Sequence, residues 1–202
     1  MNSHLSPASR TPPWLRDALR LRKQGFTLIE LMVVIAIAAI LATLAAPSMS
    51  KMFSSNRVQA EASSFAGDLM QARAEAVKQG QGVSLCASSD GITCLGKNTW
   101  QVGWIMFSDA SQCASIPASP PVIRIRAAFK GSDTMVATAP ATNSCISFNR
   151  EGFTSNLGSA AVSFAVHTAN NYANSTRCVM VTFGGSLSTV SKGTAVMGVT
   201  CS

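Results

Sequence analysis

The chain has 202 residues, of which 47% are hydrophobic and only 12% are charged, and its formal net charge is +7. This composition excludes a solvated disordered chain, which needs the opposite balance, and it suits one ordinary domain with a membrane segment. Residues 1–25 hold five basic side chains and one acidic one, so more than half of the positive excess lies directly before an apolar run. The charge therefore indicates membrane orientation by the positive-inside rule rather than a nucleic-acid partner.

The segment before the apolar run contains no strong structural signal. Residues 1–13 are polar and proline-rich, and we predict that they are disordered. Residues 14–24 mix apolar and basic side chains. They fit either a short amphipathic helix on the membrane face or a solvated leader without structure of its own.

The main apolar run covers residues 31–46, contains no charge and ends before Pro47. Counted from Phe26, it has 21 residues, or about 31 Å as a helix, which matches a bilayer hydrocarbon core of about 30 Å. The rival interpretation is a cleaved secretory signal. Residues 42–44 and 44–46 offer it only weak small-x-small cut sites.

The helical period continues after the apolar run and changes character. Apolar residues recur three or four apart and predict one stripe on an amphipathic helix, with most charged residues off it: Val58, Ala62, Phe65, Leu69, Ala72 and Ala76. We expect Pro47 to kink or locally melt this helix, and Gly80 and Gly82 to end it. One half of the helix would then be a membrane anchor and the other half the spine of a soluble domain.

From residue 83 onward, short apolar or alternating runs are separated by turn residues and contain no internal repeat. Six or seven antiparallel strands are expected, at 83–87, 101–107, 122–129, 145–148, 161–167, 178–183 and 195–200. The fold class is therefore α+β, with a long N-terminal helix packed on an antiparallel β-sheet. Trp100 and Trp104 would face the same way on a strand, and we expect them to pack on the helix stripe rather than to form a binding face.

All six cysteines follow the apolar run, which suggests disulfides in an oxidising compartment. None lies in a CxxC pair, and both histidines lie far from any ligand set, so we expect no metal and no cofactor. Six cysteines allow 15 pairings. Sequential pairing would close local loops in the first and last pairs and leaves the middle pair by elimination: Cys86–Cys94, Cys113–Cys145 and Cys178–Cys201.

The boundary between the basic leader and the apolar run carries the most specific signal. Residues 24–30 read QGFTLIE, and the run then continues to Pro47. This string resembles the class III signal of type IV pilins and type II secretion pseudopilins. The resemblance implies that a prepilin peptidase cuts after Gly25 and methylates the new amine of Phe26. Gly25 suits this role because the absence of a side chain lets the scissile peptide approach a catalytic centre closely.

The resemblance also implies the organisation and location of the chain. It predicts a cleaved leader over 1–25, a transmembrane helix half over 26–46, an amphipathic half over 47–80 and a β-rich domain over 81–202. The mature protein would be a single-pass inner-membrane protein with its C-terminal domain in the periplasm, later carried to the pilus and cell surface. Its partners would be other pilins through the N-terminal helix, the prepilin peptidase and the inner-membrane assembly platform.

Glu30 is a carboxylate at the edge of a hydrocarbon segment, where an unpaired charge costs on the order of a few kcal/mol. The family explanation is a pair with the new amine of Phe26 in the same or a neighbouring subunit. The alternative is that Glu30 lies in the headgroup layer.

The rest of the chain resembles minor pilins and pseudopilins of the FimT, FimU and GspH type. The similar segments begin at Asp68, Val83, Trp100 and Cys145, and the closing Cys178…Cys201 loop also fits. The expected function is a minor pilin in the tip or priming complex of a type IV pilus. The alternatives are a type II secretion pseudopilin and a DNA-binding pilus subunit.

DNA uptake and enzymatic activity are the two functions that the residues favour least. The DNA-binding branch carries a Gly-Arg-x-Arg motif, but the matching stretch here is Gly185-Ser-Leu-Ser. Arg124 and Arg126 share one strand face, yet without interleaved aromatic residues they indicate a solvated edge strand. No nucleophile elbow, carboxylate-pair motif or metal spacing indicates an enzyme.

Overall fold

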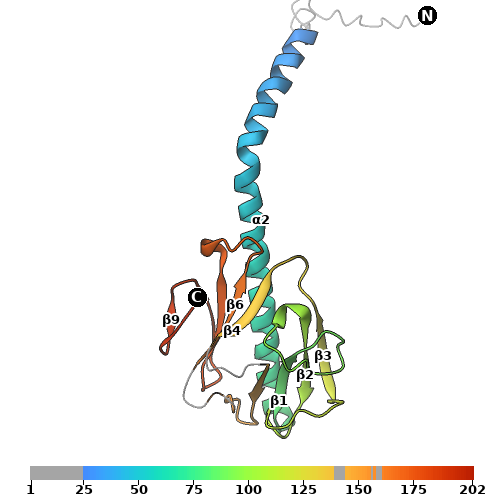
Figure 1. The fold of residues 1–202 in the computed structure, drawn as a ribbon, viewed down its shortest axis with the longest axis vertical. Helices are drawn as coiled ribbons and strands as arrows, with labels where there is room; N and C mark the ends of the chain where they lie inside the picture. The colour runs from blue at the N-terminus through green and yellow to red at the C-terminus, as the bar shows by residue number, and fades with distance from the viewer. Residues whose placement is uncertain (1–24, 139–143, 156, 158–160) are drawn as a thin grey trace, which may run out of the picture. The chain divides into compact units, whose positions relative to one another are not determined.

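The computed structural model describes residues 25–138, 144–155, 157 and 161–202, and the chain divides into two compact units, Met1–Ala46 and Pro47–Ser202 (Figure 1). The expectations for residues 1–13 and 14–24 lie outside the described residues.

One helix, α2 (Leu28–Gln79), includes the apolar run and the amphipathic stretch. It begins two residues after Phe26 because Thr27 caps it: the Thr27 hydroxyl accepts a hydrogen bond from the Glu30 amide (3.3 Å). The segment Leu28–Ala46 has a mean hydropathy of 2.7 and none of it is buried, so by length and composition it can cross a membrane. Pro47 lies inside α2, and its kink stays a prediction.

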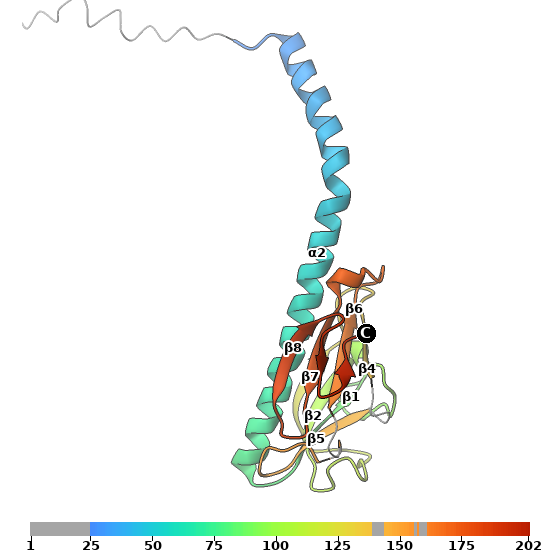
Figure 2. The same cartoon turned by 90° about the vertical axis from the view of Figure 1, so that its left-hand side faces the viewer.

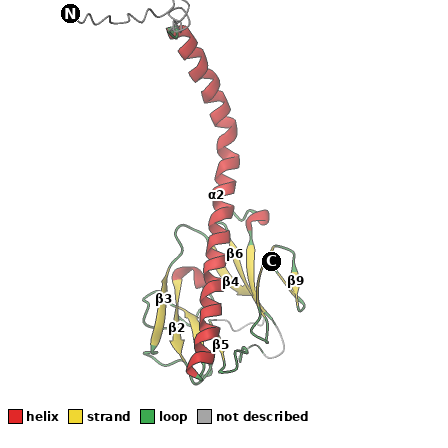
Figure 3. Cartoon of the chain, turned by 180° about the vertical axis from the view of Figure 1, so that it is seen from behind, coloured by secondary structure: helices red, strands yellow, loops and turns green. Residues whose placement is uncertain are grey.

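In the second unit, α2 packs across two antiparallel sheets, and in the view from behind β2 and β3 appear on one side of the helix and β4 and β6 on the other (Figure 3). The first sheet has the order β3-β2-β1-β5 and comprises Val122–Ala127, Gly103–Ser108, Val83–Ala87 and Cys145–Phe148. The second has the order β4-β6-β7-β8 and comprises Thr134–Thr138, Val162–His167, Arg177–Val181 and Leu187–Ser191 (Figure 2). Short 3-10 helices η1 (Trp100–Val102) and η2 (Ala173–Ser175), and a hairpin of β9 (Ala195–Val196) and β10 (Val199–Thr200), complete the fold.

The α+β class is confirmed, but the number of strands and sheets differs from the expectation. The expected strand 195–200 is a hairpin, since Met197 and Gly198 both have positive φ (50° and 81°) and turn the chain. Strands β4 and β8 were not expected because both are short edge strands with few buried residues, and the exposed positions of β8 are all polar.

The six residues of the helix stripe are all completely buried, which confirms the amphipathic prediction. Phe65 lies at the centre of this core, with its ring centroid 5.5 Å from that of Trp100, 5.0 Å from Trp104 and 4.7 Å from Phe164. Both tryptophans thus pack on the helix as expected, although Trp100 belongs to η1 rather than to a strand. Gly80 ends the helix with a left-handed φ of 65°.

Three disulfides tie loops and the C-terminus over the outer faces of the sheets. They join the same cysteines as the sequential pairing: Cys86–Cys94, Cys113–Cys145 and Cys178–Cys201. In β1, Val83, Leu85 and Ala87 face the helix core, whereas Cys86 belongs to a second buried cluster on the other face.

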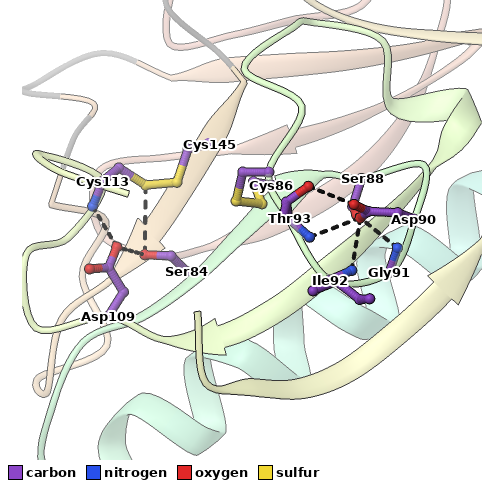
Figure 4. Close-up of a disulfide and its surroundings, with 11 residues drawn as sticks. Ser84, Cys86, Ser88, Asp90, Gly91, Ile92, Thr93, Asp109, Cys113 and Cys145 are labelled. Carbon is purple, nitrogen blue, oxygen red and sulfur yellow. Dashed lines mark hydrogen bonds between the residues drawn. A yellow bond between two sulfur atoms is a disulfide. The ribbon is translucent and has the colours of Figure 1, made fainter. Parts of the chain in front are cut away.

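The loops beside the first two disulfides are fixed by carboxylates (Figure 4). Asp109 accepts hydrogen bonds from the Ser84 hydroxyl (2.8 Å) and the Cys113 amide (2.7 Å). Asp90 accepts from the amides of Ile92 and Thr93, both at 2.8 Å. These bonds satisfy the local backbone and explain both acidic residues structurally.

Candidate assembly site

The processing motif lies at the start of the first unit and is fully accessible in the single chain. Phe26 has 86% of its surface exposed, and a Cβ built on Gly25 would meet nothing within 4 Å. Glu30 is exposed in the first turn of α2. The structure places these three residues on the non-helical start and first turn, and their roles in cleavage, methylation and assembly stay predictions.

The second half of α2 carries another stripe that sequence reasoning did not single out. It repeats every three or four residues, contains no charge and is exposed throughout: Met49, Phe53, Asn56, Ala60, Ser63, Gly67, Met70, Ala74 and Val77. It runs parallel to the buried stripe at an offset of two residues, or about 200° around the helix, so the two stripes lie on opposite sides. The uncharged periodicity of this stripe is visible in the sequence. Its meaning becomes clear only when the buried stripe is known to face the sheets, because the second stripe is then the face of the helix that the domain leaves exposed.

Gly67 has no side chain, so it is the position on this exposed stripe where another helix could approach α2 most closely. A Cβ at Gly67 would meet nothing within 4 Å, whereas one at Gly82 would lie 2.3 Å from the Asp109 carbonyl oxygen. Glycine inside a helix costs about 1 kcal/mol relative to alanine. The fold of its own chain therefore gives no reason for glycine at position 67.

Between the two stripes, one flank of α2 is bound to the sheets by ion pairs. Arg57 donates to Asp133 through Nε (2.5 Å) and Nη2 (2.7 Å). Asp68 accepts two bonds of 2.8 Å from Arg126 and one of 3.0 Å from Trp104 Nε1. Because Asp68 and Asp133 are buried, each carboxylate fixes a strand or loop at one position along the helix.

Arg124 and Arg126 were expected on a solvated edge strand, and only half of that expectation is correct. Strand β3 is an edge strand, and both side chains share one face. That face turns toward the helix, where Arg124 donates to Gln71 and pairs with Asp68 at 3.3 Å. The local sequence could not reveal this because Asp68 lies on a helix that is remote in the chain.

Glu61 lies on the same flank and has an unusual environment. Its Oε2 atom is buried and has no hydrogen-bond partner in the described part of the chain. Burial and the adjacent Asp133 carboxylate raise the pKa of Glu61 to about 7, and Arg57 only partly opposes them. Burial also works against ionisation of Asp133, but hydrogen bonds from Arg57 and the Ala169 amide hold its pKa below the ordinary value.

One group of potential metal ligands occurs among the described residues, formed by Asp109, Cys113 and Cys145. Both cysteines are joined in a disulfide, so neither offers a thiolate. The carboxylate is already hydrogen-bonded to Ser84, Ser111 and the Cys113 amide. The chemistry of this group does not fit a metal site.

Residues 61–185, more than half of the chain, match the family described as type II transport protein GspH. The chain belongs to the GspH family. Its residues 20–46 also match the prokaryotic N-terminal methylation motif. A comparison with curated proteins gave no match. The family and motif matches confirm the expected minor pilin or pseudopilin type and indicate a single-pass, membrane-anchored subunit.

The fold of this GspH-family chain is similar to that of the type IV minor pilin FimU of Pseudomonas aeruginosa. The TM-score is 0.52 and the identity 22%, over 66% of this chain and 87% of that chain. The minor pseudopilin EpsH from the type 2 secretion system of Vibrio cholerae aligns with a TM-score of 0.46 and 12% identity, over 67% and 97% of the two chains. The FimU likeness concerns the fold and confirms the expected pilin architecture.

Proposed function

We propose that this protein is a minor pilin that is cut after Gly25, held in the inner membrane by Leu28–Ala46, and assembled through α2 into the tip or priming complex of a type IV pilus. Its β-rich domain lies in the periplasm before assembly. The prepilin peptidase and the inner-membrane assembly platform are its partners in processing and assembly. The role is structural, and we assign no catalytic step to the chain.

The exposed uncharged stripe of α2 is the observation that carries this proposal. Its large members, Met49, Phe53, Met70 and Val77, expose between 45% and 60% of their surface. Apolar positions at this spacing suit packing against a second helix, and small residues between them permit close approach. A neighbouring pilin helix is the partner that fits both features.

A type II secretion pseudopilin is the second candidate function. The description of the matched family, type II transport protein GspH, favours it. Deletion of the gene in its natural host distinguishes the two candidates: loss of surface pili with intact protein secretion supports the pilus role, and the reverse result supports the secretion role.

Nucleic-acid binding has less support. Arg124 and Arg126 both form ion pairs with Asp68, which partly neutralises their charge and weakens the attraction for phosphate groups. We therefore do not propose DNA uptake as the function of this subunit.

The processing and assembly steps are tested together with Glu30→Ala. Intact mass and N-terminal sequencing of the membrane-extracted protein should find methylated Phe26 at the N-terminus of both wild type and variant. The variant should be depleted from the sheared filament fraction by at least about tenfold, because the amine of Phe26 loses its carboxylate partner in hydrocarbon. A different mature N-terminus would disprove the cut site, and normal incorporation of the variant would disprove the charge pairing.

A further inference from the structure

A cleft of about 330 Å³ opens on the flank of α2, where the helix meets the start of β2, the end of β3 and the segment that follows β3. Aromatic and small apolar side chains form much of its wall, namely Trp104, Phe129, Ala60, Ala127 and Ala128. The rings of Trp104 and Phe129 are edge-to-face, with centroids 6.0 Å apart. Such a wall favours an apolar group rather than a fully hydrated ion.

Cations line the same cleft. The side chains of Arg57 and Arg126 are 40% and 35% exposed, and Lys130 is exposed. Both arginines use Nε and Nη2 to hold their carboxylates, and among the described residues Nη1 of neither arginine makes a hydrogen bond. Lys130 likewise forms no ion pair with any described residue. Arg57, Arg126 and Lys130 therefore each have N–H groups that remain available to a ligand in the cleft.

The charge balance around the cleft is positive. Arg57, Arg124, Arg126 and Lys130 oppose the ionised carboxylates of Asp68 and Asp133. Glu61 also lines the cleft, and its raised pKa of about 7 leaves much of it neutral near that pH. The site therefore lacks at least one negative charge, which a ligand can supply.

We propose that this cleft receives an acidic side chain, carried on an apolar segment, from a different pilin subunit of the filament tip. The inference rests on the proposed function and adds the chemistry of the partner. The carboxylate accepts hydrogen bonds from Lys130 and the unused guanidinium nitrogens, while its apolar neighbours pack on Trp104 and Phe129. The cavity is large enough for one side chain, so the contact defines position in the filament rather than a broad interface.

The partner is a different subunit because the acidic side chains of a second copy are already engaged. Under the proposed function, Glu30 pairs with the amine of Phe26, and the acidic side chains of the second unit have partners of their own. In the described part of Pro47–Ser202, Glu61 lines the cleft itself. The other acidic side chains already have cationic or hydrogen-bonding partners: Asp68, Glu75, Asp90, Asp109, Asp133 and Glu151. A symmetric contact between two copies would bring two positive clefts together without a carboxylate between them. A heterotypic contact removes this repulsion.

The test uses the full-length protein, produced at its natural level in its host with the other pilins present. A photo-reactive benzoylphenylalanine replaces Ala128, which is exposed on the rim of the cleft. After illumination, the cross-linked peptide is identified by mass spectrometry. We expect a peptide that contains Asp or Glu and belongs to another protein with the N-terminal methylation motif.

Two charge reversals then test the electrostatic part of the contact. Lys130→Glu should lower the cross-linking yield by at least about tenfold, because it places a like charge against the partner carboxylate. Lys97→Glu is the matched control, an exposed lysine outside the cleft, and should leave the yield unchanged. When the cross-linked acidic residue of the partner is also changed to Lys, the cross-linking yield of the Lys130→Glu variant should be restored.

The outcomes distinguish this inference from the proposed function. A cross-link to a second copy, to nucleic acid or to a protein without the pilin motif overturns the inference, as does a yield that Lys130→Glu does not change. Sheared filaments from the same cells report incorporation of the protein. If the protein is incorporated but the photo-reactive residue at position 128 forms no cross-link to an acidic pilin peptide, only the inference fails. If the protein is absent from filaments, the proposed function fails.

Discussion

The second half of α2 carries two uncharged stripes with the same spacing and opposite environments. The stripe from Val58 to Ala76 is completely buried, whereas the stripe from Met49 to Val77 is exposed throughout. The buried stripe contains the large ring of Phe65, and the exposed stripe contains Gly67 only two residues later. The difference separates two roles of one helix: one stripe folds the domain, and the other is available to a second chain.

The largest effect on stability should come from the buried stripe. Phe65→Ala removes a ring that contacts Trp100, Trp104 and Phe164 and leaves a cavity at the centre of the core. We expect the free energy of unfolding to fall by about 3–5 kcal/mol. Thermal unfolding of the purified full chain in detergent, followed by near-ultraviolet circular dichroism, measures the loss.

Phe53→Ala is the matched control on the exposed stripe, because Phe53 has 60% of its surface exposed. It should leave the unfolding temperature within error of wild type and lower incorporation into filaments. Equal destabilisation by the two substitutions would contradict the division of roles between the stripes.

The ion pairs between the stripes should have the next largest effect. Asp68→Asn removes the charge that holds Arg124 and Arg126 against the helix and leaves both guanidinium groups without their carboxylate. Since the arginines are 40% and 35% exposed, solvent offsets part of the cost, and we expect a loss of about 2 kcal/mol. Denaturant unfolding measures it, with Glu75→Gln, which removes an exposed pair with Lys78, as a control that should not change the midpoint.

The two stripes also show how far sequence reasoning reaches in this protein. The buried stripe could be predicted because helical periodicity is local, and Gly80 could be predicted as its end because a left-handed residue there favours glycine. Asp68 could not be predicted as a buried partner, because Arg126 lies 58 residues away along the chain. Its burial depends on how β3 packs beside the helix, which no local pattern specifies.

The strands show the same limit. Those that carry buried residues on both faces, such as β6 and β7, were predicted nearly to their ends. Strand β8 was missed because its residues are mostly exposed and polar, and only pairing with β7 holds it in the sheet. The cleft beside Trp104 and Phe129 could not be predicted for a related reason: its walls come from α2, β2, β3 and the segment after β3, and they meet only in the folded domain.

A smaller, pH-dependent effect should come from Glu61. Its pKa is about 7 in the folded protein against 4.5 for an ordinary glutamate, so the folded chain holds a proton that the unfolded chain lacks between these values. Stability from this group should therefore be complete below pH 4.5 and fall as the pH rises to about 7. Because Glu61 is partly exposed, we expect a change on the order of 1 kcal/mol.

Glu61→Gln isolates this contribution, because glutamine is neutral at every pH and keeps the shape of the protonated acid. The variant should match wild type near pH 4.5 and be more stable than wild type at pH 8. Burial lowers the pKa of His167 and gives the opposite slope, but His167 is common to both proteins and cancels in the difference. Parallel unfolding curves at pH 4.5, 6 and 8 that show a constant difference would contradict the raised pKa.

The smallest effect on folding should come from Gly67, and it offers the sharpest test of the exposed stripe. Since a side chain at Gly67 meets no atom of its own chain, both Gly67→Ala and Gly67→Leu should fold, with a gain of up to about 1 kcal/mol from better helix propensity. A leucine side chain at position 67 would prevent the close approach of a neighbouring helix. Gly67→Leu should therefore be processed normally yet depleted from sheared filaments by at least about tenfold. Gly67→Ala, which adds one methyl group, should be incorporated much more efficiently. If both variants enter filaments like wild type, the exposed stripe is not a helix-packing surface. Depletion of Gly67→Leu alone, at unchanged stability, assigns assembly to the exposed stripe.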